Sequence, residues 1–328
     1  MTAKYIIDIE KCIKKTGERL GEGDFSVVEK AILLPNAPQN KGHIETPCAI
    51  KYFRQSSDSE AVENLRNELN LQISLQHPSI LQAYGYSIPI MGQGDFCLVL
   101  EYAPNKTLKE ALQAEDKQIS FDGWTQTKKA ISIFGIAAGM LYMHQHNIMH
   151  RDLKSANILL DEHFYPKISD FAVAKSNKEG IEQMLQQTPT GTPAYMAPEI
   201  LQQEPYNNKV DVFSFAIILY EIFTCKVPSE DPQNKNKFQL ASFIMGKRPT
   251  LNDRFPDFFK QLIEDCWAHD PNKRPSFAQI LIRLKQAFED EEIFDDDTYD
   301  RAEIKDYLEM VLADLKLEDP DGSSSTKK

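Results

Sequence analysis

One stretch of the chain decides how the rest is interpreted, and it reads Ile148-Met149-His150-Arg151-Asp152-Leu153-Lys154-Ser155-Ala156-Asn157-Ile158-Leu159-Leu160. It places a carboxylate, Asp152, five residues before an amide, Asn157, and closes on a short apolar run. A second carboxylate follows in Ile168-Ser169-Asp170-Phe171-Ala172, eighteen residues after Asp152. Polar turn residues between strands are the ordinary explanation for one such group, but they explain three groups at these spacings poorly.

Phosphoryl transfer needs this set of groups. The attacking hydroxyl has to be oriented and deprotonated by a carboxylate, for which Asp152 is the candidate. The phosphates are held with Mg²⁺, which prefers hard oxygen ligands of the kind that Asn157 and Asp170 carry. The stretch therefore predicts a catalytic carboxylate beside a magnesium site.

Two weaker signals lie nearer the N-terminus. The run Leu20-Gly21-Glu22-Gly23-Asp24-Phe25-Ser26-Val27-Val28 carries glycines that would let backbone N–H groups approach phosphates, although two glycines beside a strand more often mark a hairpin turn. Lys51 ends the apolar strand pattern Cys48-Ala49-Ile50-Lys51, where a lysine ordinarily faces solvent. Glu68 follows seventeen residues later in a helical pattern, where it could pair with Lys51 and direct it at phosphates.

The predicted elements divide the chain into a small sheet-rich part and a larger helical part. β-Prone runs lie between residues 20 and 53 and at 95–102, with one helical pattern at 60–76. After Asn105 helical patterns dominate, around 107–114, 125–146, 209–225, 255–268 and 275–289. The two kinds of structure are therefore expected to be segregated, with a short connection near residues 103–106.

Three further motifs follow the first stretch in order: Thr190-Gly191-Thr192-Pro193-Ala194-Tyr195-Met196-Ala197-Pro198-Glu199, then Val210-Asp211-Val212-Phe213-Ser214-Phe215, then Cys266-Trp267 with Arg274-Pro275-Ser276-Phe277. With these motifs the chain resembles a eukaryotic-type protein kinase over about residues 14–288. The resemblance implies that the first motif ends the activation segment and that Asp211 is a buried support of the catalytic loop. It also implies that Arg274 pairs with Glu199.

The resemblance implies an α+β, bilobal fold, with a small β-rich lobe at 14–103 and a larger α-helical lobe at 104–288. Residues 1–13 would then be an N-terminal extension. The Cys-Trp ending and the catalytic loop are similar to those of the tyrosine-kinase-like group, whereas Lys154 and the Gly191-Thr192 pair are serine/threonine-type features. The implied activity is transfer of the ATP γ-phosphate to serine or threonine hydroxyls of protein substrates, with ATP and Mg²⁺ as cofactors.

The resemblance also implies roles for individual residues. Asp152 would orient the acceptor hydroxyl, and Lys154 would neutralise the transferring phosphoryl group. Lys51 would hold the α- and β-phosphates, with Glu68 fixing it. Asn157 and Asp170 would bind the metal. The residues expected to contact the nucleotide are Leu20, Gly21, Gly23, Ser26, Val28, Ala49, Lys51, Leu100, Glu101, Ala103 and Leu159.

Three positions depart from the family pattern, and they leave a second interpretation open. Ser26 replaces the third glycine of the loop, Ala172 replaces the glycine after Asp170-Phe171, and Gln72 stands where an apolar side chain is usual. A buried glutamine needs hydrogen-bond partners, so packing there could be weaker. The alternative is a nucleotide-binding pseudokinase that acts as a scaffold. Catalysis is favoured because Lys51, Asp152, Asn157 and Asp170 are all retained.

Composition and charge exclude other classes. The chain of 328 residues is 41% hydrophobic and carries a net charge of −12, but residues 289–328 hold fifteen acidic against five basic residues. The remainder is near neutral and has no basic stripe, so nucleic-acid binding is not expected. No run reaches the roughly 20 apolar residues that a membrane-spanning helix needs, so a membrane partner is not expected either. The five scattered cysteines suit a reducing compartment, so we expect a cytoplasmic protein.

The last forty residues form an acidic tail. Residues 289–300 are predicted to be an exposed linker because acidic side chains dominate them. Residues 301–317 place apolar side chains at helical spacing and predict an amphipathic helix. Its apolar stripe is too large to remain in water, so the helix is expected to dock on the large lobe or on a partner.

Ala172 distinguishes a catalyst from a scaffold. Alanine lacks glycine's access to positive φ, at a cost of about 1 kcal/mol or more, and that access matters for flipping Asp170 and Phe171 rather than for holding a metal. Ala172→Gly should therefore change kcat by less than about tenfold, whereas Asp170→Ala should lower it more than roughly a hundredfold. Steady-state phosphate transfer measures both. A wild type that binds ATP without transferring phosphate, and that gains transfer with Ala172→Gly, would establish the scaffold.

Overall fold

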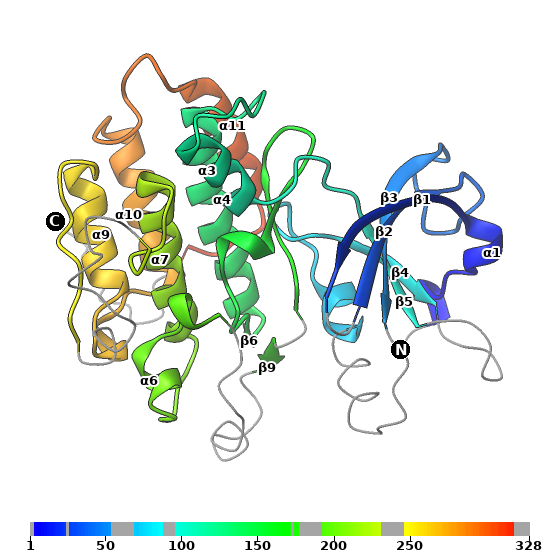
Figure 1. Ribbon diagram of the computed structural model, residues 1–328, viewed down its shortest axis with the longest axis horizontal. Helices are drawn as coiled ribbons and strands as arrows, with labels where there is room; N and C mark the ends of the chain where they lie inside the picture. Colours follow the sequence, from blue (N-terminus) through cyan, green and yellow to red (C-terminus); the bar gives the residue numbers. More distant parts are fainter. Residues whose placement is uncertain are drawn as a thin grey trace, which may run out of the picture. The chain divides into compact units, whose positions relative to one another are not determined.

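The computed structural model describes residues 3–23, 26–53, 69–87, 96–171, 174–176, 192–230 and 246–317. The chain forms two compact units, Met1–Pro104 and Asn105–Lys328. Figure 1 shows that strands dominate the first unit and helices the second, which confirms the predicted α+β, bilobal fold class. The division lies one residue after the expected lobe boundary at 103. No helix in the described part of the chain is long and apolar enough to cross a membrane.

The first unit is built on an antiparallel five-stranded sheet in the order β1-β2-β3-β5-β4. The strands are β1 (Ile13–Glu22), β2 (Ser26–Leu33), β3 (Thr46–Phe53), β4 (Ala83–Ser87) and β5 (Cys97–Glu101). Alternate residues of a strand face opposite sides. One face therefore carries the hydrophobic core, which includes Ala31, Cys48, Ile50 and Val99.

Residues 3–13, expected as an extension, are part of the first unit. They form η1 (Ala3–Tyr5) and α1 (Ile9–Cys12), and Ile7 between them is 1% exposed in the core. The Ile7 N–H donates to the Tyr86 carbonyl at 2.8 Å, so this segment pairs with β4 at the edge of the sheet. Gly85 makes the approach possible, because a Cβ there would lie 2.4 Å from the Tyr5 carbonyl oxygen. The segment thereby covers backbone groups that an edge strand leaves unpaired.

The second unit is mainly helical. Its α-helices are α3 (Leu108–Asp116), α4 (Gln126–Gln145), α6 (Pro198–Leu201), α7 (Lys209–Thr224), α9 (Asp257–Cys266), α10 (Phe277–Glu289) and α11 (Arg301–Leu312). Short strands form two pairs, β6 (Ile148–Met149) with β9 (Lys175–Ser176) and β7 (Ile158–Leu160) with β8 (Pro166–Ile168). Helices α4 and α7 are buried on nearly all sides, as their apolar sequences predict. The predicted ends of α3, α4, α7, α9 and α10 agree with the structure within two residues.

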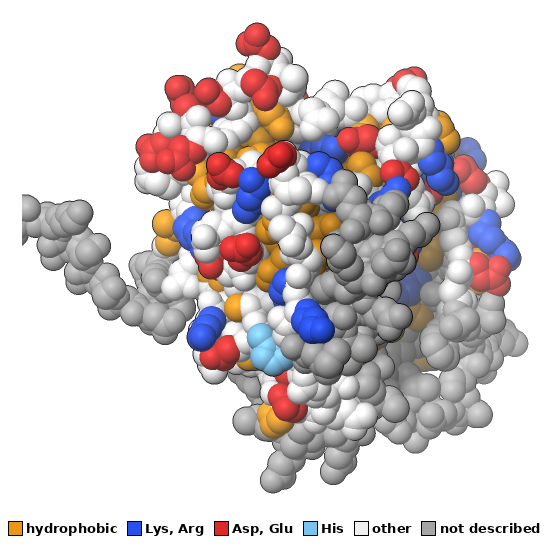
Figure 2. Space-filling view, turned by 60° about the vertical axis from the view of Figure 1, so that its left-hand side comes forward, with side chains coloured by type: hydrophobic (Ala, Val, Ile, Leu, Met, Phe, Trp, Pro, Cys, Tyr) orange, Lys and Arg blue, Asp and Glu red, His pale blue; other side chains and the backbone are white. Residues whose placement is uncertain are grey.

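The acidic segment 289–300 is not a simple exposed linker, so that prediction is wrong. Ile293 and Phe294 are 3% and 7% exposed, and the Phe294 ring lies 6.0 Å from Phe134 and 5.5 Å from Phe259. The acidic side chains remain outside, and Figure 2 shows acidic side chains grouped at the upper left of its face. Two apolar residues bury enough surface to anchor the segment while its charges stay hydrated.

The tail helix α11 ends at Leu312, five residues before the predicted end at 317, and packs against α4. Its buried face holds Ile304, Tyr307, Leu308 and Val311. A glycine of α4 makes the close approach possible, since a Cβ on Gly135 would lie 2.2 Å from the Tyr307 hydroxyl. Glu303 forms an ion pair with Lys128 and accepts a hydrogen bond from the Tyr165 hydroxyl. The helix is thus held by packing and by polar contacts.

Truncation after Asp290 tests how much this segment contributes. It would remove six buried apolar side chains, each worth about 1.5–3 kcal/mol at most, and leave the facing surface of α4 exposed. We expect a loss of about 3 kcal/mol or more, which lowers Tm by roughly 6–12 °C. Calorimetry measures it, with a chain ending at Leu317 as the control, since that chain lacks only polar residues of the tail. If both truncated chains melt at the temperature of the full chain, α11 is merely an appendage.

Candidate active site

The loop that carries Asp152 is hydrogen-bonded to a buried carboxylate of α7. Asp211 Oδ2 accepts from the His150 N–H at 3.0 Å, and Oδ1 accepts from the Arg151 N–H at 2.9 Å. These bonds stabilise a turn in which Arg151 has a φ of 65°, in the left-handed region. The expectation that Asp211 supports the catalytic loop is therefore met.

His144 of α4 provides the third hydrogen bond to Asp211. Its Nε2 lies 2.9 Å from Asp211 Oδ2, and its ring packs edge-on against Phe277. Burial alone would raise the pKa of Asp211, but hydrogen bonding and the charge interaction with His144 bring it below the usual value. The sequence indicated no role for His144, because only the fold brings it to the same carboxylate as the loop.

Asp152 and Lys154 lie together at the surface of this loop. The Lys154 ammonium donates to Asp152 Oδ2 at 2.7 Å, and Thr192 N–H donates to Asp152 Oδ1 at 3.1 Å. Lys154 also donates to Thr192 Oγ1 at 2.9 Å. The Asp152 side chain is 11% exposed, so its carboxylate is fixed in orientation and still partly accessible. A carboxylate and a cation held this way can orient a hydroxyl and balance negative charge on its partner.

The hairpin of β7 and β8 brings Asn157 and Asp170 to one end. Ile158 pairs with Ile168 across the hairpin, and Ser169 donates to the Asn157 carbonyl through both its N–H and its hydroxyl, each at 2.9 Å. Asn157 Nδ2 donates to the Asp152 carbonyl and carboxylate, so its amide oxygen is the atom left for a ligand.

A magnesium site fits the donors at this end of the hairpin. Asp170 is exposed and has a φ of 66°, in the left-handed region. The described residues contain no group of three or more His, Cys, Asp or Glu that could hold a metal by themselves. Mg²⁺ bound with substrate phosphates needs only one or two protein oxygens, which Asn157 and Asp170 can provide.

The first unit places its candidate residues on one face of the sheet. Lys51 is paired with Val28 on β2, Val28 with Gly21 on β1, and Ala49 with Leu100 on β5. Directly paired residues face the same side, and residues two apart on a strand do too. All five therefore lie opposite the core face that carries Cys48, Ile50 and Val99.

The glycine loop leaves room for a ligand. A Cβ on Gly21 or Gly23 would meet no described atom within 4 Å, and neither glycine has a positive φ. The Gly23 N–H donates to the Ser26 carbonyl at 2.9 Å, which closes the turn. Leu20 is 40% exposed. Neither packing nor backbone strain among the described residues demands glycine at these two positions.

The remaining candidates are distributed between the units. Glu101 ends β5, and Ala103 follows it in the connection to the second unit. Leu159 belongs to β7 of the second unit. Glu68 and Ala172 lie outside the described residues. Gln72 is 3% exposed and donates to the Leu81 carbonyl at 2.6 Å, so its buried amide has the partner it requires.

Arg274 and Glu199 form the expected pair. The guanidinium donates from Nη1 and Nη2 to the two carboxylate oxygens at 2.6 and 2.9 Å, and both side chains are buried. This fork geometry joins the end of the Thr192–Glu199 segment to the chain before α10.

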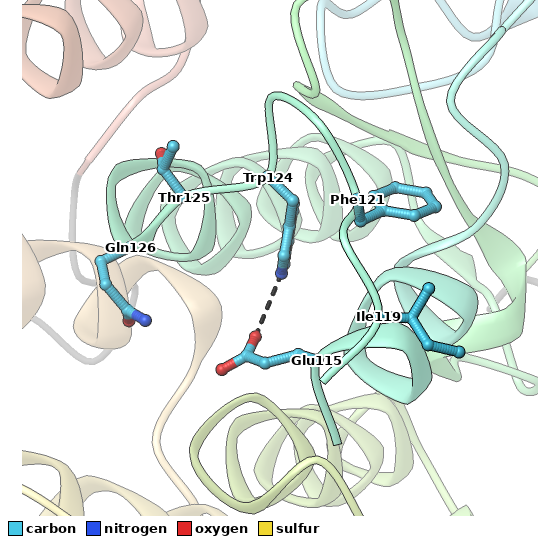
Figure 3. A pocket seen from close by; sticks show the side chains of 6 residues that line it. All are labelled: Glu115, Ile119, Phe121, Trp124, Thr125 and Gln126. Atoms are coloured by element: carbon cyan, nitrogen blue, oxygen red, sulfur yellow. Dashed lines mark hydrogen bonds between the residues drawn. The ribbon is translucent and has the colours of Figure 1, made fainter. Parts of the chain in front are cut away.

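A separate pocket of about 230 Å³ lies between α3 and the start of α4. Figure 3 shows its lining: Glu115, Ile119, Phe121, Trp124, Thr125 and Gln126. Trp124 Nε1 donates to Glu115 Oε2 at 3.2 Å, and Lys129 donates to Oε1 at 2.5 Å. None of the predicted site residues lines this pocket, and its carboxylate is already paired.

His144→Leu tests the support of Asp211. The variant removes one donor from a fully buried carboxylate, and such a loss costs about 3–5 kcal/mol. In the wild type the lowered pKa of Asp211 contributes stability above pH 4 that is lost as pH falls. Without His144 burial raises that pKa, so the deficit in unfolding free energy should grow from pH 4.5 to pH 7.5. Urea unfolding measures it.

The matched control is His146→Leu, two residues after His144, at the exposed position that follows the end of α4. It should change stability by less than about 0.5 kcal/mol. Equal losses for the two variants, or a His144→Leu deficit that does not change with pH, would contradict the role given to His144.

Comparison with known proteins agrees with this geometry. The family model described as protein tyrosine and serine/threonine kinase matches residues 14–284. A probable serine/threonine-protein kinase of Dictyostelium discoideum is 37% identical over 280 residues, 84% of this chain and 19% of that protein. The dual specificity protein kinase shkB of the same organism is 35% identical over 285 residues, 84% of this chain and 40% of that protein.

A plant protein is similar at a comparable level. The serine/threonine-protein kinase STY46 of Arabidopsis thaliana is 33% identical over 242 residues, 73% of this chain and 40% of that protein. The chain thus spans about a fifth to two fifths of the length of these relatives. The match covers every motif described above, and the chain belongs to the family of protein tyrosine and serine/threonine kinases.

Proposed function

We propose that the chain is an ATP-dependent protein kinase that phosphorylates serine and threonine side chains with Mg²⁺. The observation that carries the proposal is the contact of Asp152 with Lys154 and Thr192, because it presents a fixed carboxylate beside a cation. Relatives named as serine/threonine or dual specificity kinases support the choice of acceptor. Serine/threonine specificity is also favoured by Lys154 and by its bond to Thr192.

Each group has a defined task in the proposed reaction. Asp152 orients the acceptor hydroxyl and takes up its proton on a carboxylate oxygen. The Lys154 ammonium lies 2.7 Å from Asp152 Oδ2. From there it stabilises the negative charge of the transferring phosphoryl group. Asn157 and Asp170 would hold Mg²⁺, which would neutralise phosphate charge when bound. Lys51 holds the α- and β-phosphates, with Glu68 as its partner.

The nucleotide is proposed to lie on the sheet face opposite the core of the first unit. There Val28 and Ala49 offer apolar contacts, Leu100 borders the adenine, and the backbones of Glu101 and Ala103 bond to its edge. The glycine loop covers the phosphates, and Leu159 is proposed to contact the adenine. This assignment is supported by the common sheet face of the paired strands and by the room around Gly21 and Gly23.

A pseudokinase scaffold is the alternative, and no observation favours it. Gln72, one of its motivations, is buried with a satisfied amide. We further propose a cytoplasmic protein with protein substrates and no nucleic-acid partner. Five free cysteines and the absence of a basic stripe support this.

An autophosphorylation assay with radiolabelled ATP and Mg²⁺ tests the function. The wild type should incorporate phosphate into serine or threonine, as determined by phosphoamino-acid analysis. Asp152→Asn keeps the shape of the side chain but removes its basic oxygen, so incorporation should fall more than about a hundredfold while ATP binding persists. Incorporation that is equal in the variant would show contamination, and ATP binding without any incorporation would establish the scaffold.

A further inference from the structure

Residues 3–12, here called the strap, are held on two sides within the first unit. On one side the strap meets the edge of the sheet, where Ile6 and Tyr86 form a parallel bridge. On the other side it meets the connection between β2 and β3, from which Gln39 Nε2 donates to the carbonyls of Lys4 and Ile6 at 3.1 and 3.2 Å. The strap is therefore bound through its backbone at a defined register.

Strand β4 is irregular at the point where the strap meets it. Leu100 of β5 is paired with Ala83. The preceding residue of β5, Val99, is paired with Gly85, so Tyr84 is the extra residue of a β-bulge. Bulges are frequent beside active sites, where they change the direction of a side chain.

The bulge turns Gly85 to the core face of the sheet. Val99 faces the core, and directly paired residues face the same side. In an uninterrupted ladder Gly85 would be paired with Leu98 and would face the opposite side. Tyr84 also packs against the core. Two successive residues of β4 are thus directed at the core, and the second of them has no side chain.

The strap fills the space that Gly85 leaves. A Cβ at this position would clash with the Tyr5 carbonyl oxygen and would lie 2.8 Å from Ile7 Cδ1. Ile7 is 1% exposed and belongs to the core of the first unit. The bulge and the strap therefore depend on each other, because the bulge provides a gap on the core face and the strap occupies it.

The same bulge adjoins residues that are proposed to contact adenine. Leu100 lies opposite Ala83, immediately before the extra residue. The Glu101 N–H donates to the Gln82 carbonyl, and the Gln82 N–H donates to Glu101 Oε2, both at 2.9 Å. These bonds tie the end of β5 to the residues just before the bulge. A displaced bulge would therefore move Leu100 and Glu101 together.

We propose that Tyr5, Ile7 and Gly85 are positioning residues for the nucleotide. They hold the bulge of β4 in place, and the bulge sets Leu100 and Glu101 for contact with adenine. This inference rests on the proposed kinase function. No residue of the strap is assigned a contact with ATP, so the strap acts through β4 and β5. Its loss weakens ATP binding and leaves transfer from bound ATP unchanged.

The test compares Ile7→Ala and Gly85→Ala with the wild type, each as the full chain. Ile7→Ala removes packing beneath the bulge, whereas the added Cβ of Gly85→Ala displaces the strap. The Kd for ATP, measured by titration calorimetry, should rise about fivefold in the first variant and about tenfold in the second. With dephosphorylated casein and saturating ATP, kcat should change less than about twofold. A lower kcat at unchanged ATP affinity would overturn the proposal.

Ile13→Ala is the matched control. Ile13 belongs to the same core and is 7% exposed, but it lies on β1, which three strands separate from β4. This variant should lower Tm much as Ile7→Ala does, and it should change the Kd for ATP less than about twofold. An equal loss of ATP affinity in both variants would overturn the proposal, because general loosening of the core would then explain it. So would an unchanged Kd in Gly85→Ala.

Amide hydrogen exchange separates this proposal from the proposed function. Protection of the Glu101 N–H should fall at least about tenfold in Ile7→Ala and Gly85→Ala relative to Ile13→Ala, whether or not the chain transfers phosphate. If the wild type neither binds ATP nor transfers phosphate, the kinase function fails and the exchange data still test the strap. Equal protection of Glu101 in the three variants would overturn it.

Discussion

The second unit depends on one buried carboxylate, Asp211. The loop before β7 has no repetitive hydrogen bonding of its own, and its backbone N–H groups need partners. Asp211 supplies both of its oxygens to this loop, and His144 supplies a donor to Asp211 in turn. Because the carboxylate belongs to a helix that is buried on nearly all sides, the loop bound to it is held firmly against the core. Asp152 can then be presented near the surface in a fixed orientation.

The polar residues of α7 explain how a mostly apolar helix serves a polar site. Asp211, Ser214 and Glu221 each bind a segment that carries or contacts the candidate catalytic groups. The rest of the helix packs into the core, so these three are held by surroundings that do not move independently. The free-energy cost of removing these polar side chains from water is offset only where their oxygen atoms form hydrogen bonds. All three side chains form such bonds.

Where the candidate groups are close in the chain, the sequence alone identified side chains that the structure brings together. Asp152, Lys154 and Asn157 lie within six residues, so their mutual contacts follow from one turn of backbone. The hairpin that brings Asp170 to Asn157 is also local. The tail was predicted less well, because charge density along residues 289–300 concealed two anchoring apolar residues. Residues 3–13 were not predicted to belong to the sheet unit, because the edge of β4 with which Ile7 pairs is formed only by the tertiary structure.

The sequence alone encodes the order of the motifs, the α+β division and the groups proposed to carry the chemistry, because each depends on residue types at short spacing. Which distant residues complete the candidate site depends on the tertiary structure. His144 and Asp211 are sixty-seven residues apart, and Ser155 and Glu221 are sixty-six. No periodicity links such positions. His144 reaches Asp211 because α4 and α7 pack against each other. Ser155 reaches Glu221 because Asp211 binds the backbone of the same loop and so holds that loop against α7.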